Sequence, residues 1–432
     1  MLRFVRKLFA QNILLQVGSL NSLAIGVRVV CGLITSKLIA IYVGASGMAI
    51  LGDLRNFMSS LQSLGQLGIS NGVIKYAATY KKEEKQLRAL VATVLKLPFL
   101  VSLGLGILVV IAAPQFNRLI FDIGTDFTTI IRLAGIALPL FTLQTLLLNI
   151  LNGLGDYRRV IFINLSVNLA GMLLSVVLII WYSLWGAMLA VVVAGILALG
   201  ITLFFLRKYF ENAKAVFGLK ADVQILKKLG SYAFMSLFSA VAAPWVYIAI
   251  RQYIIATDGI EQAGYWDAML RLSDYYLMFA TSVLTLYVLP KLASATGKNQ
   301  LRRVTLDFYK SILPFFALCL IAIFLLKGFI IRLVYDASFL EMRPIFIWQL
   351  AGDLIRVASL VIAYEIIAKN KVKTFVITQI VSLSIIYFSS VWLVSHYGFV
   401  GAGMAHLFSY SLYLLVLLGI FRKELFSRPS TD

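Results

Sequence analysis

Ionisable side chains interrupt the long apolar runs of this sequence. If those runs cross a bilayer, each charged group costs several kcal/mol in hydrocarbon, so such groups usually face a protein-lined, water-filled cavity. We therefore take them as the candidate lining of a polar cavity. The basic candidates are Arg28, Lys37, Arg55, Arg251, Arg271 and Arg356, and the acidic candidates are Asp53, Asp267, Asp274 and Asp353.

Helical spacing relates several of these charges to one another. Asp267, Arg271 and Asp274 stand at i, i+4 and i+7, which places them on one face of a helix as an acid-base-acid ladder. Asp353 and Arg356 are spaced so that they can pair within one helix. The spacing predicts two polar helix faces in the second half of the chain.

Asp53 differs from the other acidic candidates because it points away from the helix face that carries Arg55. Its partner must therefore come from another helix, or the carboxyl group titrates. For Asp53, as for Asp267, Asp274 and Asp353, the residues alone leave charge pairing and ion coupling open.

The basic candidates are suited to an anion. The planar guanidinium fork matches phosphate oxygens geometrically, so a pyrophosphate is the kind of group that this cavity could hold. One or two of the arginines could instead join helices through backbone carbonyls. Lys37 lies on the opposite face of the helix from Arg28 unless the helix bends near Gly32.

Signatures of enzymes are absent from the sequence. It contains no phosphate-binding loop, no histidine cluster with metal-ligand spacing and no nucleophile elbow. The two cysteines, Cys31 and Cys319, both lie in apolar runs, which supports neither a disulfide framework nor a metal site. We expect no catalytic residue, no metal, no cofactor and no enzymatic activity.

Composition places the chain in a membrane. Of its 432 residues 61% are hydrophobic and 13% are charged, and the mean hydropathy is +0.91. Soluble domains carry about 25% charged residues. Apolar runs long enough to cross about 30 Å of hydrocarbon recur along the chain. We expect twelve spans, at 20–43, 45–69, 88–113, 128–153, 159–182, 184–206, 229–255, 263–289, 305–328, 344–368, 374–395 and 398–421.

The formal charge of +20 is explained by topology rather than by nucleic acid, because the basic residues are spread over many loops. Most of them fall on the side of the N-terminus. Only Arg118, Lys327, Arg332 and Arg343 fall in loops of the opposite side. By the positive-inside rule, the sequence predicts a multi-pass membrane protein with both termini in the cytoplasm.

An internal duplication organises the spans. Shifting the sequence by about 214 positions superposes Arg88, Lys96 and Asp122 on Arg302, Lys310 and Asp336. Six spans per half give both halves the same orientation, an arrangement of transporters with the substrate site between the halves. We expect an all-α fold of two parallel six-helix bundles around a central cavity, with lobes 1–206 and 229–421, a cytoplasmic linker 207–228 and a tail 422–432.

Five short motifs follow one another along the chain, namely Ser36-Lys37-Leu38, Leu51-Gly52-Asp53-Leu54-Arg55, Asn71-Gly72-Val73-Ile74-Lys75-Tyr76, Tyr287-Val288-Leu289-Pro290 and Trp348-Gln349-Leu350-Ala351-Gly352-Asp353. In this order they resemble the polysaccharide flippases of the multidrug/oligosaccharidyl-lipid/polysaccharide exporter superfamily, in particular Wzx-type flippases for O-antigen or enterobacterial common antigen lipid III. The resemblance covers nearly the whole chain.

The resemblance implies a transporter of the bacterial inner membrane that moves undecaprenyl-pyrophosphate-linked oligosaccharide from the cytoplasmic to the periplasmic leaflet by alternating access. Basic cavity residues serve the pyrophosphate in that family. By position this role falls on Arg28, Lys37, Arg55 and Arg251, with Arg356 next. The other implied partners are membrane lipids and, in the same pathway, glycan polymerase and chain-length proteins.

Two other functions stay open. A cation-coupled drug exporter of the same superfamily would have a less basic cavity, and a membrane-embedded glycan polymerase would need a large periplasmic loop. If the anion site is correct, we expect Arg28→Ala, Arg55→Ala or Arg251→Ala to abolish surface glycan at normal protein levels.

Overall fold

The computed structural model describes residues 13–121, 124, 126–207, 222–293, 300–369 and 371–426. Every regular element in these ranges is a helix. The chain forms two compact units, which we describe separately. Unit 1 comprises Met1–Leu38 and Leu54–Val241, and unit 2 comprises Ile39–Asp53 and Ala242–Asp432.

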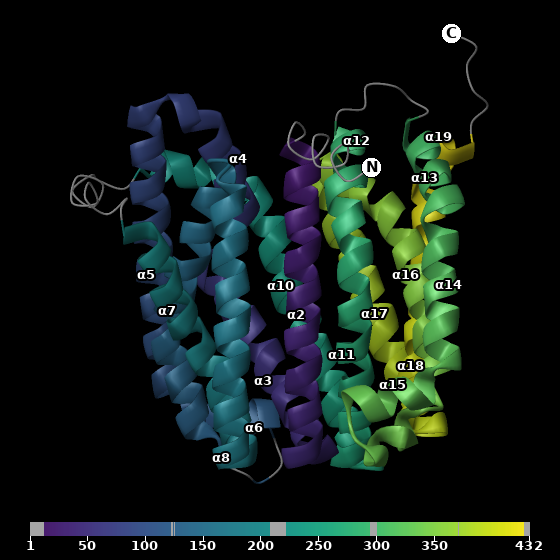
Figure 1. Cartoon of the computed structure of the whole chain (residues 1–432). Coiled ribbons are helices and arrows are strands. Elements are labelled where there is room, and N and C mark those ends of the chain that lie inside the picture. Colours follow the sequence, from purple (N-terminus) through teal and green to yellow (C-terminus); the bar gives the residue numbers. More distant parts are fainter. Residues whose placement is uncertain are drawn as a thin grey trace, which may run out of the picture. The chain divides into compact units, whose positions relative to one another are not determined.

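Helix α7 is the centre of unit 1, where it packs against α4, α5, α6 and α8. α5 and α7 can be followed side by side in Figure 1. The helices that lie wholly in this unit are α4 (Ser70–Thr79), η1 (Tyr80–Lys82), α5 (Glu84–Ile111), α6 (Ala113–Phe121), α7 (Thr128–Gly153) and α8 (Tyr157–Leu206). α2 (Ile13–Tyr42), α3 (Gly44–Gly65) and α10 (Val223–Asp258) are each shared with unit 2.

Short polar side chains mark where helices of unit 1 begin. Asp126 accepts a hydrogen bond from the backbone N–H of Thr128 at 2.9 Å, and Asp156 accepts one from Arg159 at 3.4 Å. Such acceptors satisfy N–H groups that have no partner within the helix. Hydrogen bonds from the Thr128 side chain and backbone hold the pKa of Asp126 below its ordinary value.

Two helices of unit 2, α16 (Ile345–Ala368) and α18 (Val400–Ile420), pack closely against each other, and α11 (Ile260–Val283), α14 (Leu313–Leu325) and α17 (Val372–Tyr397) contact this pair. α11 continues through a π-helical turn, Leu284–Val288, which precedes Pro290. A proline lacks the N–H that a regular helix needs there. The remaining elements are α12 (Leu289–Ala293), α13 (Gln300–Ser311), α15 (Lys327–Val334), η4 (Ala337–Met342) and α19 (Arg422–Phe426).

Helix α8 contains 50 residues and includes a sharp corner at Ser183, where φ is 50° and ψ is −124°. A straight helix of that length would span about 75 Å at 1.5 Å per residue, far more than the roughly 30 Å core of a bilayer. The corner divides α8 at the boundary that we expected between the spans 159–182 and 184–206.

The same corner geometry recurs in the second half of the chain. A methyl group added at Gly186 would collide with the carbonyl oxygen of Leu178, and one added at Gly401 would collide with that of Leu393. Gly44, between α2 and α3, has a φ of +76°, and Gly259, between α10 and α11, has a φ of +101°. Glycine adopts this conformation without steric cost.

Nine helices in the described ranges are long and apolar enough to cross a membrane, one of which is the divided α8. The expected spans 45–69 and 263–289 are not among the nine. These two spans contain Asp53 and Arg55, and Asp267, Arg271 and Asp274, so charge lowers their hydropathy. Most of the expected linker, from 208 to 221, and the tail from 427 onward lie outside the described residues.

Candidate functional site

A buried cluster of three charges joins three helices of unit 2. The Nη1 of Arg251 on α10 donates to Oδ1 of Asp53 on α3 at 2.5 Å, and its Nη2 donates to Oδ1 of Asp267 on α11 at 2.6 Å. The Arg251 side chain is 1% exposed. Its guanidinium carbon also lies 5.5 Å from the ring centre of Trp266, within the range of a cation–π contact. We call Asp53, Arg251 and Asp267 the acid–Arg251 triad.

Glycines allow the helices around the triad to approach closely. A methyl group at Gly52 would meet the carboxylate of Asp267 and the guanidinium of Arg251. One at Gly264, in the first turns of α11, would meet the backbone of Ala45 in α3. Small residues permit such close packing between membrane helices. The residue types of α3 and α11 therefore bring the two carboxylates to one guanidinium.

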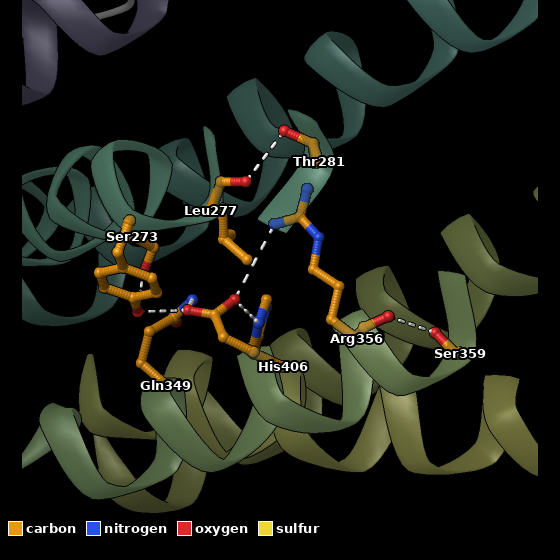
Figure 2. A network of polar contacts seen from close by, with 9 residues as sticks. Ser273, Leu277, Thr281, Gln349, Arg356, Ser359 and His406 are labelled. Atoms are coloured by element: carbon orange, nitrogen blue, oxygen red, sulfur yellow. Dashed lines mark hydrogen bonds and ion pairs between the residues drawn. The ribbon is translucent and has the colours of Figure 1, made fainter. Parts of the chain in front are cut away.

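A second buried cluster surrounds Asp353 on α16. Its Oδ1 lies 3.0 Å from Nε2 of His406 on α18, and its Oδ2 accepts a 2.5 Å hydrogen bond from the hydroxyl of Tyr276 on α11. Nε2 of Gln349 is 3.5 Å from the same Oδ2, and Nη1 of Arg356 is 3.9 Å from Oδ1. We call this set the Asp353 network. Figure 2 shows Gln349, His406 and Arg356 converging within it.

Arg356 is a member of the Asp353 network whose exposure bears on ligand binding. Its side chain is 31% exposed, and its guanidinium carbon lies 5.5 Å from the ring centre of Tyr410. Asp274 is exposed, and its carboxylate interacts electrostatically with Arg356, Asp353 and Arg271. Arg356 is therefore a partly exposed cation beside two carboxylates.

The basic candidates of unit 1 lie on α2 and α3. Arg28 is exposed, whereas Lys37 and Arg55 are half-buried. Lys37 and Arg55 both have interactions with neighbouring groups. A basic side chain that keeps surface available in an apolar helix can contact an anion directly.

The structure confirms two expectations about ion pairs. Asp53 has a partner on another helix, Arg251 on α10. Asp353 and Arg356 approach each other within α16. In the ladder on α11, by contrast, Asp267 pairs with Arg251, and the Nε of Arg271 donates to the hydroxyl of Tyr275 at 3.0 Å. Spacing along one helix could not reveal these partners.

Sequence reasoning favoured a packing or hydrogen-bonding role for His406, but it did not identify His406 or Tyr276 as a partner of Asp353. A single histidine or tyrosine in an apolar span gives no spacing signal, and both meet Asp353 only through helix packing. Gly352, which precedes Asp353, lies against the His406 ring, so a side chain there would block the approach of α18 to α16.

The Asp353 network predicts a measurable cost for losing one hydrogen bond. Tyr276→Phe removes a hydroxyl that donates to a buried carboxylate, so we expect the free energy of unfolding to fall by about 1–3 kcal/mol. Thermal unfolding of the detergent-solubilised protein measures this change. As a control, Tyr364→Phe removes an exposed hydroxyl and should change stability by less than about 0.5 kcal/mol. Equal effects of the two substitutions would contradict the assignment.

An apolar groove of about 750 Å³ lies on α16, α17 and α18. Its walls include Phe388 and Trp392, whose side chains are 68% and 61% exposed, together with Trp348 and Phe408. Exposed aromatic residues on apolar helices are compatible with contact to lipid chains.

The helices and their buried charges define a multi-pass membrane protein with a transporter fold. A solved multidrug resistance MATE family transporter of the MOP superfamily, in an inward-facing conformation, matches with a TM-score of 0.74 and 14% identity over 92% of this chain and 94% of its own. The lipid II flippase MurJ matches with a TM-score of 0.69 and 18% identity over 94% and 88%.

Sequence comparison then places the chain in a family. Residues 14–296 match the family model described as polysaccharide biosynthesis protein, and the chain belongs to this family. Curated relatives named lipid III flippase, from Escherichia coli (strain K12) and Shigella flexneri, are each 28% identical over 406 residues. The matches cover 91% of this chain and 95% of each relative.

Proposed function

We propose that this protein is a flippase that moves lipid-linked oligosaccharide across a membrane. The observation that carries the proposal is the match over nearly full length to relatives named lipid III flippase. The fold likeness to the lipid II flippase MurJ agrees with it. The chain is a transporter and not an enzyme, because these relatives translocate a substrate rather than transform it.

The proposed substrate is an oligosaccharide linked to undecaprenyl pyrophosphate, either an O-antigen or an enterobacterial common antigen repeat unit. Transfer runs from the cytoplasmic to the periplasmic leaflet by alternating access. The proposed location is the bacterial inner membrane, and the distribution of basic loop residues favours cytoplasmic termini. Glycan polymerase and chain-length proteins are the proposed partners that consume the flipped unit.

The proposed architecture is twelve transmembrane helices in two parallel six-helix bundles, 1–206 and 229–421, joined by linker 207–228. Two observations support it. The corner in α8 separates two stretches that are each long enough to span a bilayer. Gly44 and Gly259 both have a positive φ, and Gly186 and Gly401 both lie against the carbonyl oxygen of the residue eight positions earlier, at corresponding places in the two halves.

The proposed pyrophosphate ligands are the basic groups that keep exposed surface, namely Arg28, Lys37, Arg55, Arg271 and Arg356. Arginine forks bind phosphate oxygens with charge-assisted hydrogen bonds. Arg251 differs from them, because both of its terminal nitrogens already donate to carboxylates. We therefore propose that Arg251 affects transport without contacting the substrate.

A cation-coupled drug exporter is the second candidate, and the fold likeness to multidrug transporters favours it. Fold likeness at 14% identity does not extend to the substrate. The exposed arginines favour an anionic substrate over the cationic compounds that a drug exporter of this kind would carry.

A vesicle assay tests the proposed function. The purified protein is reconstituted into liposomes that contain a lipid-linked oligosaccharide, and the glycan reaching the opposite leaflet is measured with a lectin or glycosidase that cannot cross the membrane. We expect flipping in protein-containing liposomes and none in empty ones. Failure to flip this substrate, together with ion-driven efflux of a cationic dye, would establish the drug exporter instead.

A further inference from the structure

Residues 39–53 form a segment that belongs to unit 2, although the chain on both sides of it belongs to unit 1. The segment contains the end of α2, the corner at Gly44 and the first part of α3. Its last residue is Asp53, one of the two carboxylates that hold Arg251. An ion cluster therefore sits at the point where the chain leaves unit 2.

We propose that the acid–Arg251 triad is a releasable clamp that holds segment 39–53 in unit 2, and that flipping requires the clamp to open and re-form. Asp53, Arg251 and Asp267 are thus positioning residues, which act on the substrate through the segment that they hold. The flipping part of this inference rests on the proposed function, whereas the clamp itself does not.

The bonding of Arg251 argues against direct substrate binding in this conformation. Its two terminal nitrogens are occupied by Asp53 and Asp267, and its side chain is almost fully buried. A phosphate would have to displace a carboxylate and would be repelled by the one that remained. Arg251 therefore acts through the segment that the triad holds and not as a ligand of the anion.

The bonding of the triad suits a contact that can open. The triad buries two carboxylates against one guanidinium, and the Nε of Arg251 has no hydrogen-bond partner within the described residues. The free energy that the charged groups lose on leaving water offsets much of their electrostatic attraction. A buried ion cluster therefore adds little net stability while it is intact. Two arrangements of similar free energy, clamped and released, are what such a balance permits.

The surrounding backbone supplies the places where the segment and α10 can bend. Gly44 holds a φ of +76° at the corner of the segment. α10 passes from unit 1 to unit 2 between Val241 and Ala242, and Pro244 follows inside the helix. Proline removes one hydrogen bond of the helix ladder, so helices bend at such positions.

Each of the three charges also lies at a similar distance from the nearer end of its helix. Asp53 and Asp267 lie two to three turns after the starts of α3 and α11, and Arg251 lies two turns before the end of α10, roughly 10–14 Å along each axis. In the proposed topology these are the periplasmic ends of the helices. The clamp therefore lies near the periplasmic end of its unit in that topology.

Thiol accessibility tests the clamp. In a chain with Cys31 and Cys319 replaced by alanine, Ala49→Cys places a probe in segment 39–53 at a fully buried position. We expect Asp53→Asn and Asp267→Asn each to raise its rate of labelling by a water-soluble maleimide roughly tenfold, equivalent to 1.4 kcal/mol in the opening equilibrium. Labelling that stays unchanged in both variants would overturn the proposal.

Matched controls separate clamp opening from general loosening. Ala402→Cys, buried in α18 of the same unit, should label at the parent rate in the Asp→Asn variants. Gly52→Ala should raise Ala49→Cys labelling because its methyl group displaces the triad, whereas Gly419→Ala, with open space around it, should not. If the Asp→Asn variants do not accumulate, the comparison of these two glycine variants decides.

The flipping assay tests the second half of the inference. The Asp→Asn variants should lose most flipping while binding lipid-linked oligosaccharide as tightly as the parent. Faster labelling with normal flipping would show that the clamp opens without serving transport, and would overturn that half. If the parent protein itself does not flip the substrate, the proposed function fails, but the labelling result still decides the clamp.

Discussion

Replacing Arg251 by methionine should lower the free energy of unfolding by about 3–5 kcal/mol, because it leaves Asp53 and Asp267 buried without a counter-charge. The measurement is thermal unfolding of the detergent-solubilised protein, combined with its amount in the membrane. We expected normal protein levels for Arg251→Ala from the sequence. Burial of the guanidinium changes that expectation, since loss of glycan would now be accompanied by loss of protein.

Neutralising the carboxylates at the same time provides the control. The triple variant Asp53→Asn, Arg251→Met, Asp267→Asn contains no unpaired charge, so its stability should return to within about 1 kcal/mol of the parent. Flipping should not return with it, because the clamp is absent. A triple variant that is as unstable as Arg251→Met would contradict the ion-cluster explanation.

Arg271→Met shows whether the effect is specific to the triad. Arg271 also lies in a span of unit 2, but it is partly exposed and donates to the neutral hydroxyl of Tyr275. Within the described residues, Arg271→Met therefore leaves no buried carboxylate without a counter-charge. We therefore expect a smaller loss of stability than for Arg251→Met.

The class of fold could be predicted from the sequence because hydropathy depends on local composition. Helices were also predicted at 45–69 and 263–289, where α3 and α11 lie, although Asp53 and Arg55 lower the hydropathy of α3 and three charges do the same to α11. The corner of α8 could be predicted because two spans are needed for so long an apolar run.

The partners of the charged residues followed from the sequence only where they share a helix. Asp353 and Arg356 are an example, because their separation on α16 fixes their distance. Arg251 and its two carboxylates come from α10, α3 and α11, and His406 reaches Asp353 from α18. Such contacts depend on which helix faces pack together, and one sequence does not contain that information.

Exposed arginines offer the sharpest test of the proposed pyrophosphate site. Arg28→Ala, Arg55→Ala and Arg356→Ala should each lower the rate of flipping by about 10- to 100-fold, since one charge-assisted hydrogen bond contributes roughly 1.5–3 kcal/mol. Protein levels should stay near normal, because these side chains keep exposed surface and Asp353 retains His406 and Tyr276 as partners when Arg356 is removed. The reconstituted flipping assay and immunoblotting of membranes measure the two quantities.

Two matched substitutions identify the reason for any loss. Arg132→Ala removes an exposed arginine near the start of α7, outside the proposed site, and should leave flipping unchanged. Arg28→Lys keeps the charge but loses the planar fork, so it should restore part of the activity that Arg28→Ala removes. Full activity in all three alanine variants would exclude these arginines as pyrophosphate ligands. An equal loss in Arg132→Ala would exclude them as well, since the effect would then not depend on position at the site.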